Sequence, residues 1–400
     1  MTRTFERGAS VPELFGDGVA QQTGARLKAM GVKKCMVISD QGVVGAGIVD
    51  PIIATLAAEG IEYTLYSDVT TSDVDCIEAT HAYEAYAPDC VLAIGGGSVM
   101  DLGKMMIAAA RLNLKAEDLY KYSTGSGNIL PLNNRTSKFV IIPTTSGTSA
   151  ESTSGAVITE TASNSKLVIV SDNMKCDFVI VDPLLTMKIP AGPTTVLGLD
   201  AITHVVENMV GSLQSDFFDL VQCQLLKRMW QWLPIVVEEP DNLNAREQMS
   251  LCSHEALNNG FAGQAHGFAH AVGGNYHILH GISCAYTLPQ VIRHHANTAA
   301  RSIFAMAEAV GVPTDGSNEE VANHLARAWI RFCKSLGVTK SLKDEIAARG
   351  CEDDRDTFIK KVVDDTIKYD GALYTTYNPP VHNSRSDIER VAGEIYDTEW

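Results

Sequence analysis

The chain has 400 residues, of which 45% are hydrophobic and 20% are charged, so it contains enough apolar material for two folded domains. Its formal net charge of -16 and its lack of any basic run argue against binding to nucleic acids or anionic membranes. We find no apolar stretch long enough for a membrane span and no apolar secretory segment near the first residue. The nine cysteines are scattered without a C-x-x-C pair, which predicts inert thiols in a reducing, cytoplasmic setting.

The first half of the chain predicts a parallel sheet. Short apolar runs typical of buried strands alternate with segments of helical periodicity. The predicted strands are 33–39, 62–66, 90–94, 139–142 and 178–182, and the predicted helices are 48–59, 73–86 and 98–112. Because parallel strands need crossover connections, we expect helices on both faces of this sheet. Two further runs, 156–159 and 166–171, indicate a hairpin.

The second half of the chain predicts helices alone, because its apolar residues recur with a period of 3.6. The predicted helices are 194–210, 216–233, 244–258, 264–275, 298–310, 318–336, 341–348 and 355–369. Prolines at positions 183, 190 and 193 mark the change of pattern. The expected fold class is therefore α/β plus all-α, with an α/β domain over residues 1–188 and a helical domain over residues 189–400.

Histidines gather in the helical half, where seven of the eleven lie in one stretch. The candidate metal ligands are Asp200, His204, His266, His270 and His280. Asp200 and His204 are four residues apart on a predicted helix, which places both on one face, and His266 and His270 repeat this spacing. His280 stands beside a glycine where the chain could turn back. A single histidine is more often an ordinary core or surface residue, but this cluster predicts a shared Fe(II) or Zn(II) ion.

A glycine-rich loop follows the predicted strand 90–94. Gly95, Gly96 and Gly97 allow the backbone to approach a diphosphate, and the next helix directs its free amides toward the same place. Ser98 and Asp101 also fit a capping box, which is the purely structural interpretation of this segment. The run matches neither G-x-G-x-x-G nor a P-loop, so the loop alone does not identify a nucleotide-binding family.

A second loop, Pro143-Thr-Thr-Ser-Gly-Thr148, follows the predicted strand 139–142. The hydroxyls of Thr144, Thr145 and Thr148 could donate to phosphate or ribose oxygens. Asp40 ends the first predicted strand, where a carboxylate can accept both hydroxyls of an adenine ribose and would repel a 2'-phosphate. An aspartate at such a position can equally be a simple turn residue.

Taken together, five motifs resemble the iron-containing (group III) alcohol dehydrogenases, in order and in approximate separation, over essentially the whole chain. The motifs are Gly95-Gly-Gly-Ser-x-x-Asp101, Pro143-Thr-Thr-Ser-Gly-Thr148, Asp182-Pro183, Asp200-Ala-x-x-His204 and His266-x3-His270-x9-His280-Gly281. The resemblance implies that residues 1–188 form a dinucleotide-binding domain and that residues 189–400 form a metal-binding and substrate domain.

By the same resemblance, the metal ligands are Asp200, His204, His266 and His280, whereas spacing alone would have paired His266 with His270. His270 is then expected near the nicotinamide as a proton-relay or positioning residue. The implied metal is Fe(II), with Zn(II) or Mn(II) as alternatives, and the implied cofactor is NAD. The positions that match cofactor contacts are Asp40, Gly95, Gly96, Gly97, Ser98, Asp101, Thr144, Thr145, Thr148 and Lys166.

The chain also departs from the family pattern. Ser72 stands close to where many relatives carry an asparagine that contacts the nicotinamide ribose, and it is a possible substitute. His277 is an additional imidazole three residues before His280, and we treat it as a weaker alternative ligand. Leu257, where phenylalanine is frequent, and Gln264 are expected to contact substrate. These residues, with the polar segment 378–385, suggest a more polar pocket than that of a simple alkanol enzyme.

We therefore expect an enzyme that moves a hydride between NAD and a short-chain primary alcohol or aldehyde, including those with a polar or anionic group such as a diol, ω-hydroxy acid or sulfonate. The metal would supply the electrophile and the protein would align the reactants. The resemblance suggests a homodimer or a higher homo-oligomer, and the net charge argues against a nucleic-acid or membrane partner. Two alternatives remain open: a non-redox cyclase like dehydroquinate synthase, and a degenerate metal-binding or nucleotide-binding protein without turnover.

Overall fold

The computed structural model describes residues 10–212, 215–258, 260–375 and 384–400. The chain divides into two compact units. We call Ala9–Ile189 with Pro240–Asn259 the α/β unit, and Pro190–Glu239 with Gly260–Trp400 the helical unit. Among the described residues, no helix combines the length and the apolar character that crossing a membrane requires.

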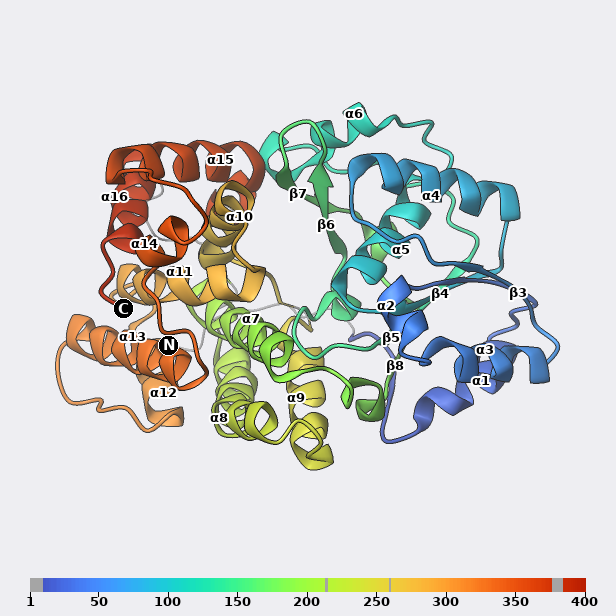
Figure 1. Cartoon of the computed structure of the whole chain (residues 1–400), viewed down its shortest axis with the longest axis horizontal. Coiled ribbons are helices and arrows are strands. Elements are labelled where there is room, and N and C mark those ends of the chain that lie inside the picture. Colours follow the sequence, from blue (N-terminus) through green and yellow to red (C-terminus); the bar gives the residue numbers. More distant parts are fainter. Residues whose placement is uncertain (1–9, 213–214, 259, 376–383) are drawn as a thin grey trace. The chain divides into compact units, whose positions relative to one another are not determined.

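The α/β unit is built on a six-stranded parallel sheet (Figure 1). Its strands are β1 (Glu13–Phe15), β2 (Lys34–Ile38), β3 (Glu62–Tyr66), β4 (Cys90–Gly95), β5 (Lys138–Pro143) and β8 (Phe178–Val181), in the order β1-β8-β5-β4-β2-β3. The five predicted strands are confirmed, and the short edge strand β1 is an addition that the sequence pattern did not indicate. All pairs within the sheet are parallel, which confirms the predicted fold class.

Helices cover both faces of this sheet, as Figure 1 shows. One face packs against α1 (Thr23–Ala29) and α3 (Val49–Ala58) through alternate strand residues such as Val37 and Leu92. The other carries α5 (Gly97–Ala109), and beside it α4 (Asp73–Tyr86). The glycine of α5 at position 103 leaves room for Ile38 and Phe139 of the sheet, because a Cβ there would lie 2.6 Å from the Ile38 side chain. The inner strands β2, β4, β5 and β8 are therefore buried on both faces, which explains why they are nearly continuous in apolar residues.

Smaller elements complete this unit: α2 (Gln41–Gly45), α6 (Ala116–Leu119), six short 3-10 segments and the antiparallel hairpin β6 (Gly155–Glu160) and β7 (Ser165–Val170). The hairpin is confirmed. Helix α9 (Leu243–Ala256) also belongs here, although it lies far along the chain. Its residues Ser253 and His254 accept hydrogen bonds from Ser149 and Ser152 through their backbone carbonyls.

The helical unit consists of α7 (Ala191–Val210), α8 (Asp216–Glu238), α10 (Gln264–Tyr276), α11 (His280–His294), α12 (Ala300–Ala309), α13 (Asn318–Ser335), α14 (Leu342–Ala347), α15 (Arg355–Thr375) and α16 (Arg385–Tyr396). Seven of these were predicted, with ends that differ by a few residues. Helices α11 and α16 were not predicted. Pro289 inside α11 had weakened the helical pattern there. Residues 376–383, which include most of the polar segment noted above, lie outside the described residues.

The chain reverses just before α11, and this corrects the expectation of a turn at His280 itself. His277 caps α10 in the left-handed conformation, with φ of 54°, and His280 is the first residue of the next helix. Gly281 then allows α11 to pack directly on α7, because a Cβ at this position would lie 1.9 Å from the Val196 carbonyl oxygen. A side chain there would push the two helices apart. Gly281 is therefore what brings His280 close to Asp200.

Candidate functional site

Three helices of the helical unit bring a carboxylate and three imidazoles together. Asp200 and His204 come from α7, His266 from α10 and His280 from α11. Asp200 Oδ1 lies 3.0 Å from His266 Nε2, 3.4 Å from His280 Nε2 and 3.7 Å from His204 Nε2. The side chain of His280 is 42% exposed, whereas the other three are buried. The cluster is thus buried on three sides and reaches solvent at His280.

Glu207 of α7 fixes the orientation of His266 by contacting the ring nitrogen that does not face Asp200. Glu207 Oε2 lies 2.5 Å from His266 Nδ1, and Glu207 Oε1 accepts from the His266 backbone N–H at 2.9 Å. A carboxylate on one ring nitrogen fixes the tautomer of a histidine and directs its other nitrogen. Glu207 therefore points Nε2 of His266 toward Asp200.

A thiol lies in the same cluster. Cys284 is one helical turn beyond His280 on α11 and is fully buried. Its Sγ lies 3.7 Å from His266 Nε2, 3.8 Å from His280 Nε2 and 3.9 Å from Asp200 Oδ1. The ligand atoms of Asp200, His266, His280 and Cys284 all lie within 4.8 Å of one another. His204 is outside this mutual set and stacks on His266, with ring centroids 4.4 Å apart.

The electrostatics of the cluster act on Asp200 and His204 in opposite ways. Burial raises the pKa of Asp200, but His204 and His280 outweigh it and hold that pKa well below its usual range, so the carboxylate stays ionised. Burial lowers the pKa of His204 to about 4, although Asp200 opposes this. His204 is therefore neutral near pH 7 and keeps a lone pair, which is the form of imidazole that binds metals.

The donor set also fits one divalent cation by distance. Atoms about 2.1 Å from one ion lie roughly 3.0 to 3.4 Å apart in octahedral or tetrahedral arrangements. The separations of His266 and His280 from Asp200 fall in this range, and that of His204 exceeds it by a few tenths of an ångström. Nδ1 of His204 is buried without a hydrogen-bond partner among the described residues. The chemistry and spacing of these side chains are therefore compatible with a shared metal ion.

His270 lies beside this cluster and has its own carboxylate. Its ring stacks on that of His280, with centroids 5.2 Å apart, and its Nδ1 lies 3.1 Å from Asp370 Oδ2. Burial lowers the pKa of His270, and Asp370 only partly opposes this, so the ring is neutral near pH 7. Asp370 has non-helical backbone angles inside α15, with φ of -122°. The kink is located at the residue that positions His270.

In the α/β unit, the two predicted loops lie at the carboxyl ends of neighbouring strands. Gly95 ends β4 and pairs with Pro143, which ends β5. The loops are in contact: a Cβ on Gly96 would lie 3.2 Å from Thr145 Cγ2, and one on Gly97 would lie 3.0 Å from Thr148 Cγ2. Within the described residues, the buried hydroxyl of Thr145 has no hydrogen-bond partner. We call these two loops, residues 95–98 and 143–148, the cradle. They lie at the edge where open α/β sheets bind ligands.

Asp101 corrects one detail of the sequence analysis. Helix α5 is capped by Gly96 without a side-chain hydrogen bond, so Ser98 and Asp101 do not form a capping box. The Asp101 carboxylate instead accepts from the Val157 backbone N–H at 3.0 Å and lies 3.2 Å from Lys104 Nζ. Asp101 thus connects α5 to the hairpin. These partners also offset the free-energy cost of burying its carboxylate.

The remaining predicted cofactor residues also lie in the α/β unit. Asp40 follows β2, the strand next to β4, and caps α2 by accepting from the Val43 backbone N–H. Lys166 of β7 donates to Thr159 Oγ1 at 2.8 Å, and Thr144 is buried at the end of β5. Ser72 caps α4 and accepts from the Asp75 backbone N–H at 3.0 Å. Asp40 and Ser72 thus each have a local structural role as a helix cap.

The two predicted substrate residues fall in different units. Leu257 is buried at the end of α9 in the α/β unit. Gln264 begins α10 in the helical unit, is buried and lies 3.2 Å from His295 Nε2 through its Oε1. The alternative ligand His277 is exposed at the end of α10 and is not part of the metal-type cluster.

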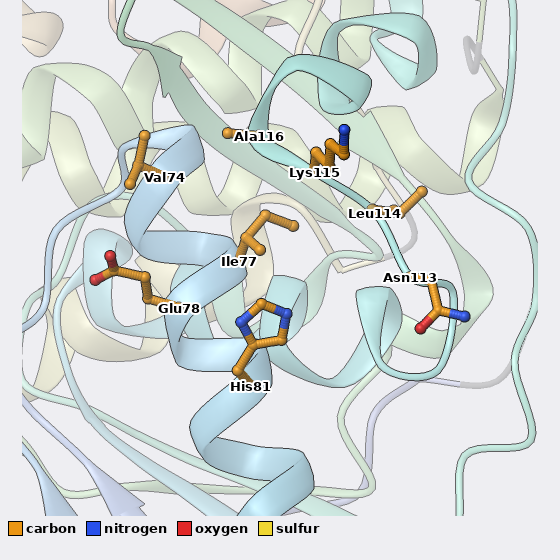
Figure 2. A pocket seen from close by; sticks show the side chains of 8 residues that line it. All are labelled: Val74, Ile77, Glu78, His81, Asn113, Leu114, Lys115 and Ala116. Atoms are coloured by element: carbon orange, nitrogen blue, oxygen red, sulfur yellow. The ribbon is translucent and has the colours of Figure 1, made fainter.

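A separate surface pocket of about 560 Å³ lies on the α/β unit (Figure 2). Its walls come from α4 and from residues 113–116, and they include Ile77, Glu78 and His81. None of the predicted cofactor or metal residues lines this pocket.

Sequence reasoning missed three residues of the helical-unit cluster. Cys284 follows His280 by four residues and Glu207 follows His204 by three, so helical spacing could have suggested both. His204 and His280, on the same helices, were identified as candidates, but α11 was not predicted as a helix. Asp370 is 100 residues from His270 in the chain, and no local pattern connects the two.

Two sequence families match the chain. Residues 12–183 match the family described as iron-containing alcohol dehydrogenase. Residues 194–383 match the C-terminal domain of the Fe-containing alcohol dehydrogenase family.

Individual relatives agree with this match. The chain is 32% identical over 350 residues to the 1,3-propanediol dehydrogenase of Citrobacter freundii, covering 86% of this chain and 89% of that protein. It is 28% identical over 344 residues to the NAD-dependent methanol dehydrogenase of Bacillus methanolicus, covering 84% and 88%. Among solved structures, an alcohol dehydrogenase from Oenococcus oeni superposes with a TM-score of 0.85 at 28% identity, covering 98% of this chain and all of that one.

Proposed function

The chain belongs to the iron-containing alcohol dehydrogenase family, and from this premise we propose that it transfers a hydride between NAD and a short-chain primary alcohol or aldehyde. The alcohol dehydrogenase class follows from the family. The observation that supports the proposal best is the cluster of Asp200, His266 and His280. The Nε2 atoms of the two histidines lie 3.0 and 3.4 Å from the same oxygen of Asp200.

In this proposal, Asp200, His204, His266 and His280 hold one divalent cation, with Fe(II) preferred and Zn(II) or Mn(II) as alternatives. When bound, the cation supplies the electrophile that polarises the substrate oxygen, and the nicotinamide accepts or donates the hydride. Asp200 brings the negative charge, and Glu207 keeps the ring of His266 in place. The half-exposed His280 marks the side from which substrate reaches the cluster.

His270 acts in the proposal as the residue that takes up or returns the proton. Its ring is neutral near pH 7 because burial lowers its pKa, so it can accept a proton during alcohol oxidation. Asp370 on Nδ1 leaves Nε2 as the nitrogen that accepts. In the opposite direction, the protonated ring returns the proton to the alkoxide oxygen as the aldehyde is reduced.

We propose that NAD lies on the cradle of the α/β unit. The glycines at 95–97 allow close approach of the diphosphate to the amides of α5, and the unpartnered hydroxyl of Thr145 supplies a donor. Asp40 would accept the hydroxyls of the adenine ribose and repel a 2'-phosphate, which favours NAD over NADP. Ser98, Asp101, Thr144, Thr148 and Lys166 complete the proposed set.

The proposed substrate is a small aldehyde or alcohol with a polar or anionic group, such as a diol, ω-hydroxy acid or sulfonate. Gln264 supports this choice because it adds an amide two residues from the proposed ligand His266. Leu257, in place of a larger aromatic side chain, would leave more room. We expect a homodimer in the cytoplasm, which light scattering and cell fractionation can test.

A substrate screen tests the proposed function. The protein, reconstituted with Fe(II) under anaerobic conditions, is mixed with NADH and acetaldehyde, propanal, lactaldehyde, succinic semialdehyde or sulfoacetaldehyde. We expect loss of NADH absorbance that depends on the metal and is fastest with a polar aldehyde. A cyclase that recycles its NAD would release no NAD+ into solution, and a degenerate binding protein would show no turnover with any aldehyde; either result would reject the proposal.

A further inference from the structure

The position of Cys284 is not explained by the four proposed ligands. Its side chain is fully buried, and its sulfur points into the cluster rather than into an apolar core. The three nearest polar atoms belong to His266, His280 and Asp200, at 3.7, 3.8 and 3.9 Å. A buried structural cysteine normally packs as a small apolar side chain. Cys284 therefore has the surroundings of a ligand.

The distances are close to those that a shared ion requires. A sulfur about 2.3 Å and a nitrogen or oxygen about 2.1 Å from one ion lie roughly 3.1 to 3.6 Å apart in octahedral or tetrahedral arrangements. The distances from Sγ to the three other donor atoms exceed this range by only a few tenths of an ångström. The donor atoms of Asp200, His266, His280 and Cys284 also lie within 4.8 Å of one another. The proposed ligand His204 is not part of this mutual set.

Helix geometry explains how the sulfur reaches this place. His280 and Cys284 are four residues apart on α11, so both side chains lie on the face that Gly281 brings against α7. Asp200 and His204 have the same spacing on α7. Each helix thus contributes two donors one turn apart. Within the part of the chain that the structure describes, no other cysteine belongs to a group of metal-type side chains.

We propose that Cys284 binds, as a thiolate, the same divalent cation as Asp200, His266 and His280. On binding, the S–H proton passes to solvent and the sulfur forms a bond to the cation, with no change of oxidation state. With His204 this gives five protein donors. Because thiolate is a soft ligand, Cys284 shifts the preference of the site toward Fe(II), Co(II) and Zn(II) and away from Mg(II) and Mn(II).

Cobalt absorption spectra test this assignment directly. The full-length protein is stripped of metal, loaded with Co(II) and compared with Cys284→Ala and Cys284→Ser at equal cobalt content. We expect a thiolate-to-cobalt charge-transfer band in the near ultraviolet for the wild type and its absence in both variants. The matched control is Cys333→Ala, which removes an equally buried thiol from α13 of the same unit and should keep the band.

Zinc affinity gives a second readout that does not depend on spectra. Competition with a chelating dye should show a dissociation constant for Zn(II) about 10- to 100-fold higher in Cys284→Ala, while that for Mg(II) changes by less than about twofold. A wild-type cobalt protein without the band, a band that survives in Cys284→Ala, unchanged zinc affinity, or failure of the wild type to bind either metal would each overturn the proposal.

The inference rests on the metal site of the proposed function but not on its substrate or cofactor. A protein that shows the Cys284-dependent band yet turns over no aldehyde would reject the proposed reaction and support the sulfur ligand. An active enzyme whose cobalt form lacks the band would do the reverse. Circular dichroism of each variant confirms that lost metal binding is not lost folding.

Discussion

The metal cluster of the helical unit and the cradle of the α/β unit are built from opposite kinds of material. The cluster depends on the identity of buried side chains: one carboxylate oxygen lies within 3.7 Å of three imidazole nitrogens. The cradle depends on the absence of side chains, since a Cβ on Gly96 or Gly97 would lie 3.2 or 3.0 Å from a threonine methyl group. One region offers specific donors, and the other offers exposed backbone.

This difference predicts how each region fails. Removing one donor from the cluster leaves the other charges buried without their partner, which costs several kcal/mol. Adding one methyl group to the cradle blocks close approach but leaves the sheet and its helices in place. Substitutions in the cluster should therefore change metal content, and substitutions in the cradle should change cofactor affinity alone.

The largest effect is expected for His266→Ala. It removes the imidazole closest to Asp200 and also leaves Glu207 Oε2 without its side-chain partner. Metal content should fall below one tenth of an equivalent, and turnover should fall by about 10³-fold or more, because the electrophile contributes several kcal/mol. Metal analysis beside steady-state kinetics measures both. A variant that stays fully metallated and fully active would contradict the ligand assignment.

His270→Ala should separate proton transfer from metal binding. The ring of His270 lies beside the cluster but is paired with Asp370 rather than with Asp200. We expect full metal content with kcat lowered by about 10²-fold, the usual contribution of a positioned acid–base group. Loss of metal together with activity would instead place His270 among the ligands, in agreement with the helical spacing that pairs it with His266.

Gly97→Ala tests the cradle. Its new methyl group would lie 3.0 Å from Thr148 Cγ2, where the loop must shift to admit it. The dissociation constant for NADH should rise about tenfold, equivalent to about 1.4 kcal/mol, with metal content unchanged. Fluorescence titration with NADH gives the constant. Gly192→Ala serves as a control for backbone stiffening, since a Cβ there meets no atom within 4 Å and the residue does not have a left-handed φ.

Asp40→Gly tests cofactor choice within the same unit. Loss of a carboxylate that accepts ribose hydroxyls should lower the preference for NAD over NADP by roughly tenfold, the value of one charged hydrogen bond. Because Asp40 also caps α2, the variant Asp40→Asn, which keeps a capping side chain, controls for local unfolding. An unchanged ratio of kcat/KM for the two cofactors would remove Asp40 from the binding site.

The smallest effect concerns pH and is confined to the α/β unit. Burial lowers the pKa of His254, but Glu13 and Glu151 outweigh it and raise the pKa to about 10. A raised folded-state pKa means that the contacts of His254 with these two carboxylates stabilise the unit fully below the unfolded pKa near 6.5 and progressively less as pH rises through 10. Between pH 8 and 10.5, His254→Gln should show a melting temperature that falls about 2 to 4 °C less than that of the wild type. Parallel curves for the two proteins would contradict this.

Several features of the fold could be predicted from sequence because they depend on local periodicity. Most of the parallel strands were found because they are short apolar runs buried on both faces, such as Cys90–Gly95. The edge strand β3 is largely exposed. The helix with Asp200 and His204 was found because its pattern is unbroken over many residues. Helix α11 was missed because Pro289 lies inside it, and tertiary packing against α7 compensates for the lost backbone hydrogen bond.

The sequence by itself determined which residue types are present at helical spacing and at strand ends: Asp200 with His204, His266 with His270, and the glycines after β4. Only the tertiary structure decided which of these meet. Glu207 reaches His266 from another helix, Asp370 reaches His270 across 100 residues, and Gly281 lets α11 bring His280 and Cys284 to Asp200. The reason is physical: spacing along one helix follows from its 3.6-residue turn, whereas contact between helices depends on how closely their surfaces can pack.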